Sequence, residues 1–338
     1  MLILLLINFL FCDTLENNLE KIVLTYMANY DYKTAEKICK DFLINYPENC
    51  KGYELLSEIY LKQNDVGNAI SINKKGIENN SECERLYFNL AEIYFQIGKY
   101  ELASEFINKF ESLQKFTIDK KTYFKTAGLI FFMLKDYTKA VKYFENYLKN
   151  DLFNIEIYEL ISKSYQNSSQ YNLANSYKEI KNLIENKKFD NSNIFKFYAG
   201  TIFLKNNCYE KAEEYFKAIY EEMIDNIKLN FNFGLTYLLL NNSMQALDYI
   251  ERAKRLYDKK YKYKKFFKRL LKTDSTGAKY TLVLALTYYL NTDYEKAENT
   301  FEEIKKYDKS LYNSFTIEDL KNKNSKLYKI LPELFDAP

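Results

Sequence analysis

The sequence predicts an all-α protein of about eight antiparallel helix pairs, and three repeating features predict it. An alanine recurs along the chain at steps of 34, 34, 37, 34, 38, 34 and 51 residues. An aromatic residue stands nine positions before every one of these alanines, and a small residue stands twelve positions before seven of the eight. Self-similarity at a period of this length indicates stacked units that bury their faces against one another.

The repeating positions form three columns. The alanines are Ala35, Ala69, Ala103, Ala140, Ala174, Ala212, Ala246 and Ala297. The aromatic residues are Tyr26, Tyr60, Tyr94, Phe131, Tyr165, Phe203, Tyr237 and Tyr288. The third column holds Val23, Ser57, Ala91, Gly128, Ser162, Gly200, Gly234 and Ala285.

The unit at residues 121–154 shows why each repeat predicts two helices. Both of its halves carry apolar residues at i, i+3, i+4 and i+7, the spacing of one helical face, and the polar pair Lys135 and Asp136 separates them. Gly128 lies inside the first half, although glycine destabilises a helix by about 1 kcal/mol relative to alanine. We therefore expect Gly128 and Ala140 to mark a close crossing of the two helices, and Gly200 and Gly234 to do the same in their units.

A small residue, an aromatic residue three positions later, a tyrosine, an alanine and a late proline form the pattern of the tetratricopeptide repeat family. The chain resembles this family from about Glu16 to Leu311, although it has no tryptophan and only Pro47 ends a unit. The resemblance implies a right-handed superhelical solenoid whose first helices line a concave, peptide-binding groove. The expected repeats are residues 16–49, 50–83, 84–120, 121–154, 155–192, 193–226, 227–260 and 278–311, with a basic insertion at 261–277.

Composition argues against catalysis. The 338 residues include no histidine, which removes the usual general base, the nucleophile pairs that contain histidine and the zinc sites that use it. No glycine-rich phosphate loop and no cluster of metal ligands is present either. The sequence therefore predicts a protein that is not an enzyme and has neither cofactor nor metal site.

The first fifteen residues begin with an uncharged apolar run, residues 1–11, that is too short to span a bilayer. The run resembles the apolar core of a secretory signal but lacks the basic residues that normally precede it. Two alternatives are a lipoprotein signal ending at Cys12 and a hydrophobic helix that packs on the first repeat. We expect an exported, periplasmic or envelope-associated protein, with a cytoplasmic location as the alternative.

The other cysteines are Cys39, Cys50, Cys83 and Cys208. Their spacing matches no metal motif. A disulfide is compatible with export, but the sequence does not supply its pairing.

Residues 259–272 contain eight lysines and arginines and no acidic residue. One interpretation is a surface for anionic lipid or nucleic acid. The other is an extended second helix whose charges lie in water. A net charge of only +3 disfavours nucleic acid as a partner, whereas a membrane surface stays a candidate. The candidate anion-binding residues are Lys260, Lys262, Lys264, Lys265, Lys268 and Arg269.

Residues 312–338 are expected to form a C-terminal capping helix. Thr316 and Asp319 have the spacing of a capping box at a helix start. Four leucines then follow at helical spacing, and Pro332 should kink or shorten the helix. The leucines are Leu320, Leu327, Leu331 and Leu334.

The last three repeats carry apolar residues on the face of the first helix that points away from the packed aromatic column. Apolar residues on both faces mean that something covers the second face. That cover is either a partner in a binding groove or the chain itself, through closure of the solenoid or through its C-terminal helix. The predicted function is a non-catalytic scaffold that binds an unidentified protein or peptide. The predicted partner-binding residues are Phe197, Leu204, Phe231, Leu235, Leu238, Leu282, Leu286 and Tyr289.

Overall fold

The computed structural model describes residues 2–113, 118–261 and 274–336, with side chains from residue 15 onward. Within these ranges the chain is helical and contains no β-strand, as the repeat pattern predicts. The chain divides into two compact units, Met1–Leu152 and Phe153–Pro338, and each is described by itself.

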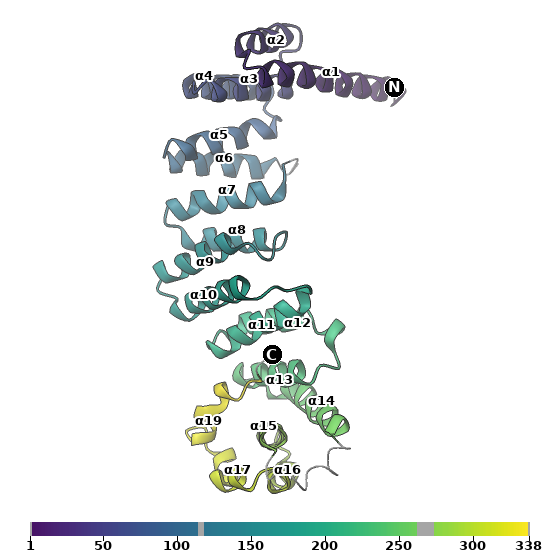
Figure 1. Ribbon diagram of the computed structural model, residues 1–338, viewed down its shortest axis with the longest axis vertical. Helices are drawn as coiled ribbons and strands as arrows, with labels where there is room; N and C mark the ends of the chain where they lie inside the picture. Colours follow the sequence, from purple (N-terminus) through teal and green to yellow (C-terminus); the bar gives the residue numbers. More distant parts are fainter. Residues whose placement is uncertain (1, 114–117, 262–273, 337–338) are drawn as a thin grey trace. The chain divides into compact units, whose positions relative to one another are not determined.

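Unit 1 is built from helix pairs in which each helix packs against the next one along the chain (Figure 1). The first helices of the pairs are α1 (Leu2–Ala28), α3 (Cys50–Lys62), α5 (Glu84–Gln96) and α7 (Lys120–Met133). The second helices are α2 (Tyr32–Asn45), α4 (Val66–Asn79), α6 (Tyr100–Ser112) and α8 (Tyr137–Leu148).

Unit 2 repeats this arrangement. Its first helices are α9 (Ile155–Asn167), α11 (Ser192–Lys205), α13 (Ile227–Leu239) and α15 (Ser275–Leu290). Its second helices are α10 (Tyr171–Asn186), α12 (Tyr209–Lys217), α14 (Ser243–Tyr261) and α16 (Tyr294–Glu303). Single 3₁₀ turns follow α12 and α16, at Glu221–Met223 and Ile304–Lys306.

Three helix pairs come into tight contact at the small residue of the first helix, which is a glycine in each of them. Gly128 of α7 faces Phe144, which lies one turn after Ala140 on α8, and a Cβ atom on Gly128 would come within 2.5 Å of the Phe144 ring. Gly200 and Gly234 are packed equally closely, with 2.6 and 2.5 Å to the nearest side-chain atom. The prediction that these glycines mark close crossings is confirmed.

The turn inside every pair contains one residue with a left-handed backbone, always five positions before the repeated alanine. Their φ angles lie between 58° and 75°. The conformation turns the chain sharply enough to start the second helix, and glycine adopts it at the lowest cost. Only one of the eight is glycine. The residues are Tyr30, Asn64, Gly98, Lys135, Ser169, Asn207, Asn241 and Thr292.

The C-terminal segment differs from the single capping helix that the sequence predicts. It forms three short helices and a 3₁₀ turn: α17 (Lys309–Ser314), α18 (Ile317–Lys321), α19 (Lys326–Ile330) and Leu331–Glu333. The predicted capping box at Thr316 and Asp319 is present and starts α18. The polar run at 322–325 then interrupts the helix, because Asn and Ser side chains compete for backbone hydrogen bonds. Of the four leucines of the predicted apolar stripe, Leu320, Leu327 and Leu331 are buried and Leu334 is half-buried.

The N-terminal run is part of α1, which continues without a break from Leu2 to Ala28. The side chains of residues 1–14, including Cys12, lie outside the described part, and α1 does not decide between a signal and a packing helix. Among the described residues, no helix has both the length and the apolar character needed to cross a membrane.

Candidate protein-interaction site

The first helices of unit 1 line an open groove. It has a volume of about 590 Å³ and lies along α1, α3 and α5. Most of the groove wall is polar, because charged side chains from all three helices reach it. The charged lining residues are Glu20, Lys51, Glu54, Glu58, Arg85 and Glu92.

The groove carries an excess of negative charge, since four glutamates face one lysine and one arginine. The Lys51 ammonium lies 2.8 Å from the Glu20 carboxylate and 3.9 Å from that of Glu54. Burial raises the pKa of Glu54, although Lys51 and Arg85 oppose the shift. Burial likewise raises the pKa of Glu92. Neither carboxylate is therefore fully compensated by the cations present, and the groove favours an additional positive charge.

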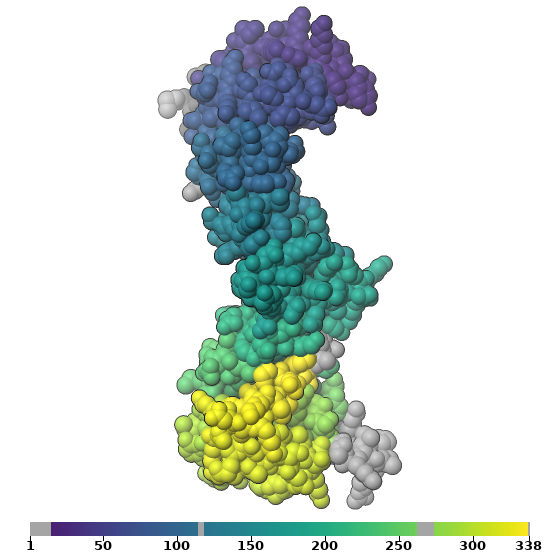
Figure 2. Space-filling model, turned by 90° about the vertical axis from the view of Figure 1, so that its left-hand side faces the viewer, coloured from purple at the N-terminus to yellow at the C-terminus, as the bar shows by residue number. Residues whose placement is uncertain are grey.

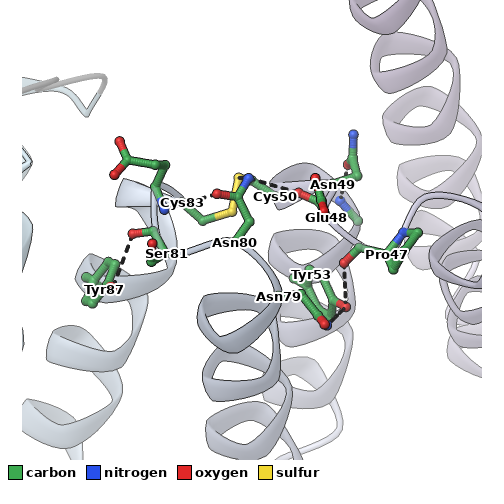
Figure 3. The surroundings of a disulfide bond; sticks show 12 residues. Pro47, Glu48, Asn49, Cys50, Tyr53, Asn79, Asn80, Ser81, Cys83 and Tyr87 are labelled. Carbon is green, nitrogen blue, oxygen red and sulfur yellow. Dashed lines mark hydrogen bonds between the residues drawn. A yellow bond between two sulfur atoms is a disulfide. The ribbon is translucent and has the colours of Figure 1, made fainter.

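A disulfide between Cys50 and Cys83 joins the beginnings of α3 and α5, which both contribute to this groove (Figure 3). Cys50 is the first residue of α3, and Cys83 is the cap of α5. Their sequence separation of 33 brings the same end of two successive units together. The bond therefore fixes the spacing of the helix ends that carry Lys51 and Arg85.

The other two described cysteines are free and buried. Burial raises the pKa of Cys39 to about 12 and also raises the pKa of Cys208. Neither is an activated thiol, because a reactive cysteine needs a lowered pKa. No group of three or more metal-ligating side chains occurs in the part of the chain that the structure describes.

The predicted partner-binding stripe of α11, α13 and α15 lies in the interior of unit 2. Seven of the eight residues are buried, and Tyr289 is half-buried. The helices that carry them pack on one another and on the C-terminal segment. In Figure 2 this segment, coloured yellow, lies across the green helices. Coverage by the chain itself, one of the two alternatives from the sequence, is thus what the structure shows. The buried residues are Phe197, Leu204, Phe231, Leu235, Leu238, Leu282 and Leu286.

The C-terminal segment is held at Asp336 by contacts to its backbone and to its side chain. The side-chain amide of Asn232 donates to the Asp336 carbonyl at 2.8 Å and accepts from the Asp336 N–H at 2.6 Å. The Tyr280 hydroxyl donates to one oxygen of the Asp336 carboxylate, and the Lys279 ammonium pairs with the other. Burial, together with this carboxylate, raises the pKa of Tyr280, so its proton stays in place as the donor.

The basic segment lies mostly outside the described residues, which resume at Asp274. Of the six predicted anion-binding residues, only Lys260 falls within them, near the end of α14. The other five are Lys262, Lys264, Lys265, Lys268 and Arg269. Anion binding by this segment stays a prediction.

Family models of the tetratricopeptide repeat match residues 84–116 and 122–151. The matched segments correspond to α5 with α6 and to α7 with α8. The same pairing of helices recurs through both units. This chain carries tetratricopeptide repeats.

Solved structures similar to this repeat protein include the MamA protein, with 20% identity and a TM-score of 0.44 over 51% of this chain and 93% of MamA. PilF of Pseudomonas aeruginosa has 15% identity and a TM-score of 0.42 over 62% and 92%. YrrB, described as a TPR protein with an unusual peptide-binding site, has 14% identity and a TM-score of 0.35 over 64% and 91%. No curated protein matches the sequence.

Aligning the repeats of this tetratricopeptide repeat protein shows a shared position that the sequence analysis missed. Asn232 stands two residues before Gly234, the small residue of its unit. Asn89 stands two residues before Ala91, the small residue of the third unit, and it lines the open groove of unit 1. No other repeat has asparagine at this position. The column could have been found by comparing all positions of the repeats rather than only the apolar ones.

Proposed function

We propose that this tetratricopeptide repeat protein is a non-catalytic interaction scaffold that binds an extended peptide segment of a partner protein in the groove of α1, α3 and α5. One observation carries the proposal. Asn89 faces this open groove at the repeat position where Asn232 holds the backbone of a non-helical segment through two hydrogen bonds. An amide side chain can donate to a carbonyl and accept from an N–H at once, so it recognises a peptide backbone of any sequence.

The Asn89 side chain makes only a long hydrogen bond within the protein. Its side-chain amide lies 3.5 Å from the Asn73 side-chain oxygen, a distance at the outer limit for a hydrogen bond. The side chain is half-buried at the groove wall. A peptide along the groove would therefore gain two backbone hydrogen bonds without breaking a strong existing one.

The charge of the groove favours a lysine or arginine on that peptide. Glu54 and Glu92 are both partly withdrawn from water, and the burial that raises the pKa of each is unfavourable for the ionised form. A cationic side chain between α3 and α5 would offset this cost. The partner expected from the groove is thus an extended basic segment.

Selection of a random displayed peptide library against the full chain tests this proposal. We expect the enriched peptides to contain lysine or arginine and to bind the Asn89→Leu variant at least about tenfold more weakly, as two lost hydrogen bonds imply. Asn108→Leu, on the exposed face of α6 in the same repeat, is the matched control and should bind like the parent. Equal binding to the Asn89→Leu variant, or selection without a basic residue, would contradict the proposal.

We also propose that the protein acts outside the cytoplasm, in the periplasm or at the cell envelope. The Cys50–Cys83 disulfide supports this location, since disulfides persist in oxidising compartments and are rare in the cytosol. The intact mass of the protein from its native host tests it. Loss of the N-terminal apolar run, or a lipid on Cys12, agrees with export, whereas a full-length reduced species in the cytosol does not.

A further inference from the structure

The contacts at Asp336 satisfy the backbone and the side chain of one residue of a non-helical segment. Asn232 is fully buried and binds both backbone groups of Asp336, while Lys279 and Tyr280 bind both carboxylate oxygens. The Lys279 ammonium also lies 5.2 Å from the centre of the Phe231 ring, in a cation–π contact. Every polar atom of the bound residue therefore has a partner on α13 or α15.

Burying an ion pair is not the most stable way to cover an apolar stripe. Removing a carboxylate and an ammonium from water costs much of what their attraction returns, and apolar replacements of similar size are often as stable. Here the Lys279 and Asp336 side chains are only 20% and 12% exposed, in a wall of leucine and phenylalanine. An apolar side chain at 336 would cover the same wall. The ion pair with Lys279 instead makes the site specific for an acidic residue at position 336.

The segment that occupies the site is weakly secured along its own length. It is preceded by α17, α18 and α19, which are 6, 5 and 5 residues long. Helices this short have almost no stability of their own. Beyond Leu331, both Leu334 and Phe335 are only half-buried. Local opening of residues 331–336 would therefore cost mainly the burial of Leu331 and the contacts of Asp336.

We infer that the site formed by Asn232, Lys279 and Tyr280 recognises an aspartate on an extended peptide, and that the chain's own segment 331–336 occupies it as an exchangeable internal ligand. A partner peptide of the same chemistry displaces this segment and takes its place. The inference goes beyond the proposed function, because it concerns unit 2 and an acidic peptide rather than unit 1 and a basic one.

The ligand class can be read from the bound segment. Residues 334–336 lie outside any helix, so the N–H and the carbonyl of Asp336 are both free to bond to Asn232. A leucine lies buried five positions earlier, and a half-buried aromatic residue directly precedes the aspartate. A competing peptide should therefore carry apolar residues followed by an aromatic residue and an aspartate.

A labelled, amidated peptide with the sequence of residues 327–336 is a suitable probe for the full-length chain. Wild-type protein should bind it weakly, because the site is occupied. The Asp336→Asn variant should bind it at least about tenfold more tightly, since its own segment no longer competes well. The same peptide with asparagine in place of its aspartate should bind this variant at least about tenfold more weakly.

Lys279→Met in the Asp336→Asn chain should remove the preference for the acidic peptide, whereas Lys305→Met, at an exposed lysine of unit 2, should keep it. Hydrogen exchange of wild-type protein gives a second measurement that needs no variant. Excess peptide should accelerate exchange of the Asp336 amide, which donates to Asn232. Equal binding of the two peptides, unchanged exchange, or a dimer in which a second copy supplies the segment would overturn the inference.

Discussion

The ring of Phe216 lies directly over Gly200, so that a Cβ atom on Gly200 would come within 2.6 Å of it. The relationship recurs between Gly128 and Phe144, and between Gly234 and Ile250. In each case the larger side chain stands four positions after the repeated alanine and fills the space that the glycine leaves. The helices of a pair thus interlock at one point, and the glycine is there for contact rather than for backbone freedom.

We predict that Gly200→Leu lowers the free energy of unfolding by about 1–3 kcal/mol, because an overpacked helix crossing must open. Thermal melting followed by circular dichroism measures the loss. Gly67→Ala is the matched control: its Cβ would have no neighbour closer than 3.7 Å, so alanine should stabilise α4 by about 0.5–1 kcal/mol. A Gly200→Leu variant that melts with the parent would show that the contact is absent.

The left-handed turn residues differ in whether they carry a side chain that strains this backbone. Thr292 has a φ of 64° despite a branched side chain, whereas Gly98 has a φ of 75° at the same repeat position. We expect Thr292→Gly to stabilise the protein by about 1 kcal/mol and Gly98→Thr to destabilise it by about 1–2 kcal/mol, since a left-handed backbone strains residues with a Cβ. Urea unfolding midpoints compare the two. A destabilised Thr292→Gly variant would contradict the strain.

Reduction of the Cys50–Cys83 disulfide should destabilise the first repeats. Closing a loop between residues 33 positions apart restricts the unfolded chain by about 3–4 kcal/mol. We expect a reductant to lower the first unfolding midpoint by the corresponding amount. The Cys50→Ser, Cys83→Ser double variant should start at the reduced midpoint and respond no further. If the reductant lowers the unfolding midpoint of the parent and of the double variant equally, the loss of stability does not come from this disulfide.

Glu54 makes stability depend on pH. Burial raises its pKa above the ordinary 4.5, so the folded protein binds this proton more tightly than the unfolded chain does. The favourable contribution is present at low pH and is lost as pH rises through the raised pKa. Glu54→Gln should therefore stabilise the protein at pH 7 but not at pH 4, in melting curves compared with the parent. Glu58→Gln, at an exposed position of the same helix, should leave the stability unchanged at both pH values.

The helix pairs could be predicted because their determinants are local. In each unit the small and aromatic residues lie three positions apart on one face of the first helix, and the alanine follows nine positions after the aromatic residue, on the second helix. The apolar stripe of α11, α13 and α15 could also be predicted, since periodicity identifies the residues that avoid water. Asn89 was missed because a polar residue in a single unit does not alter that periodicity.

By itself, the sequence determined that this chain folds as stacked tetratricopeptide helix pairs with glycines at the close crossings, because these features depend on contacts inside one unit. Only the tertiary structure decided which surfaces meet across units. It paired Cys50 with Cys83, and it placed Asp336 against Asn232, which lies 104 residues earlier. It also left the groove of unit 1 open and buried the apolar stripe of unit 2. Such contacts depend on where distant surfaces come to lie, and no local pattern specifies that.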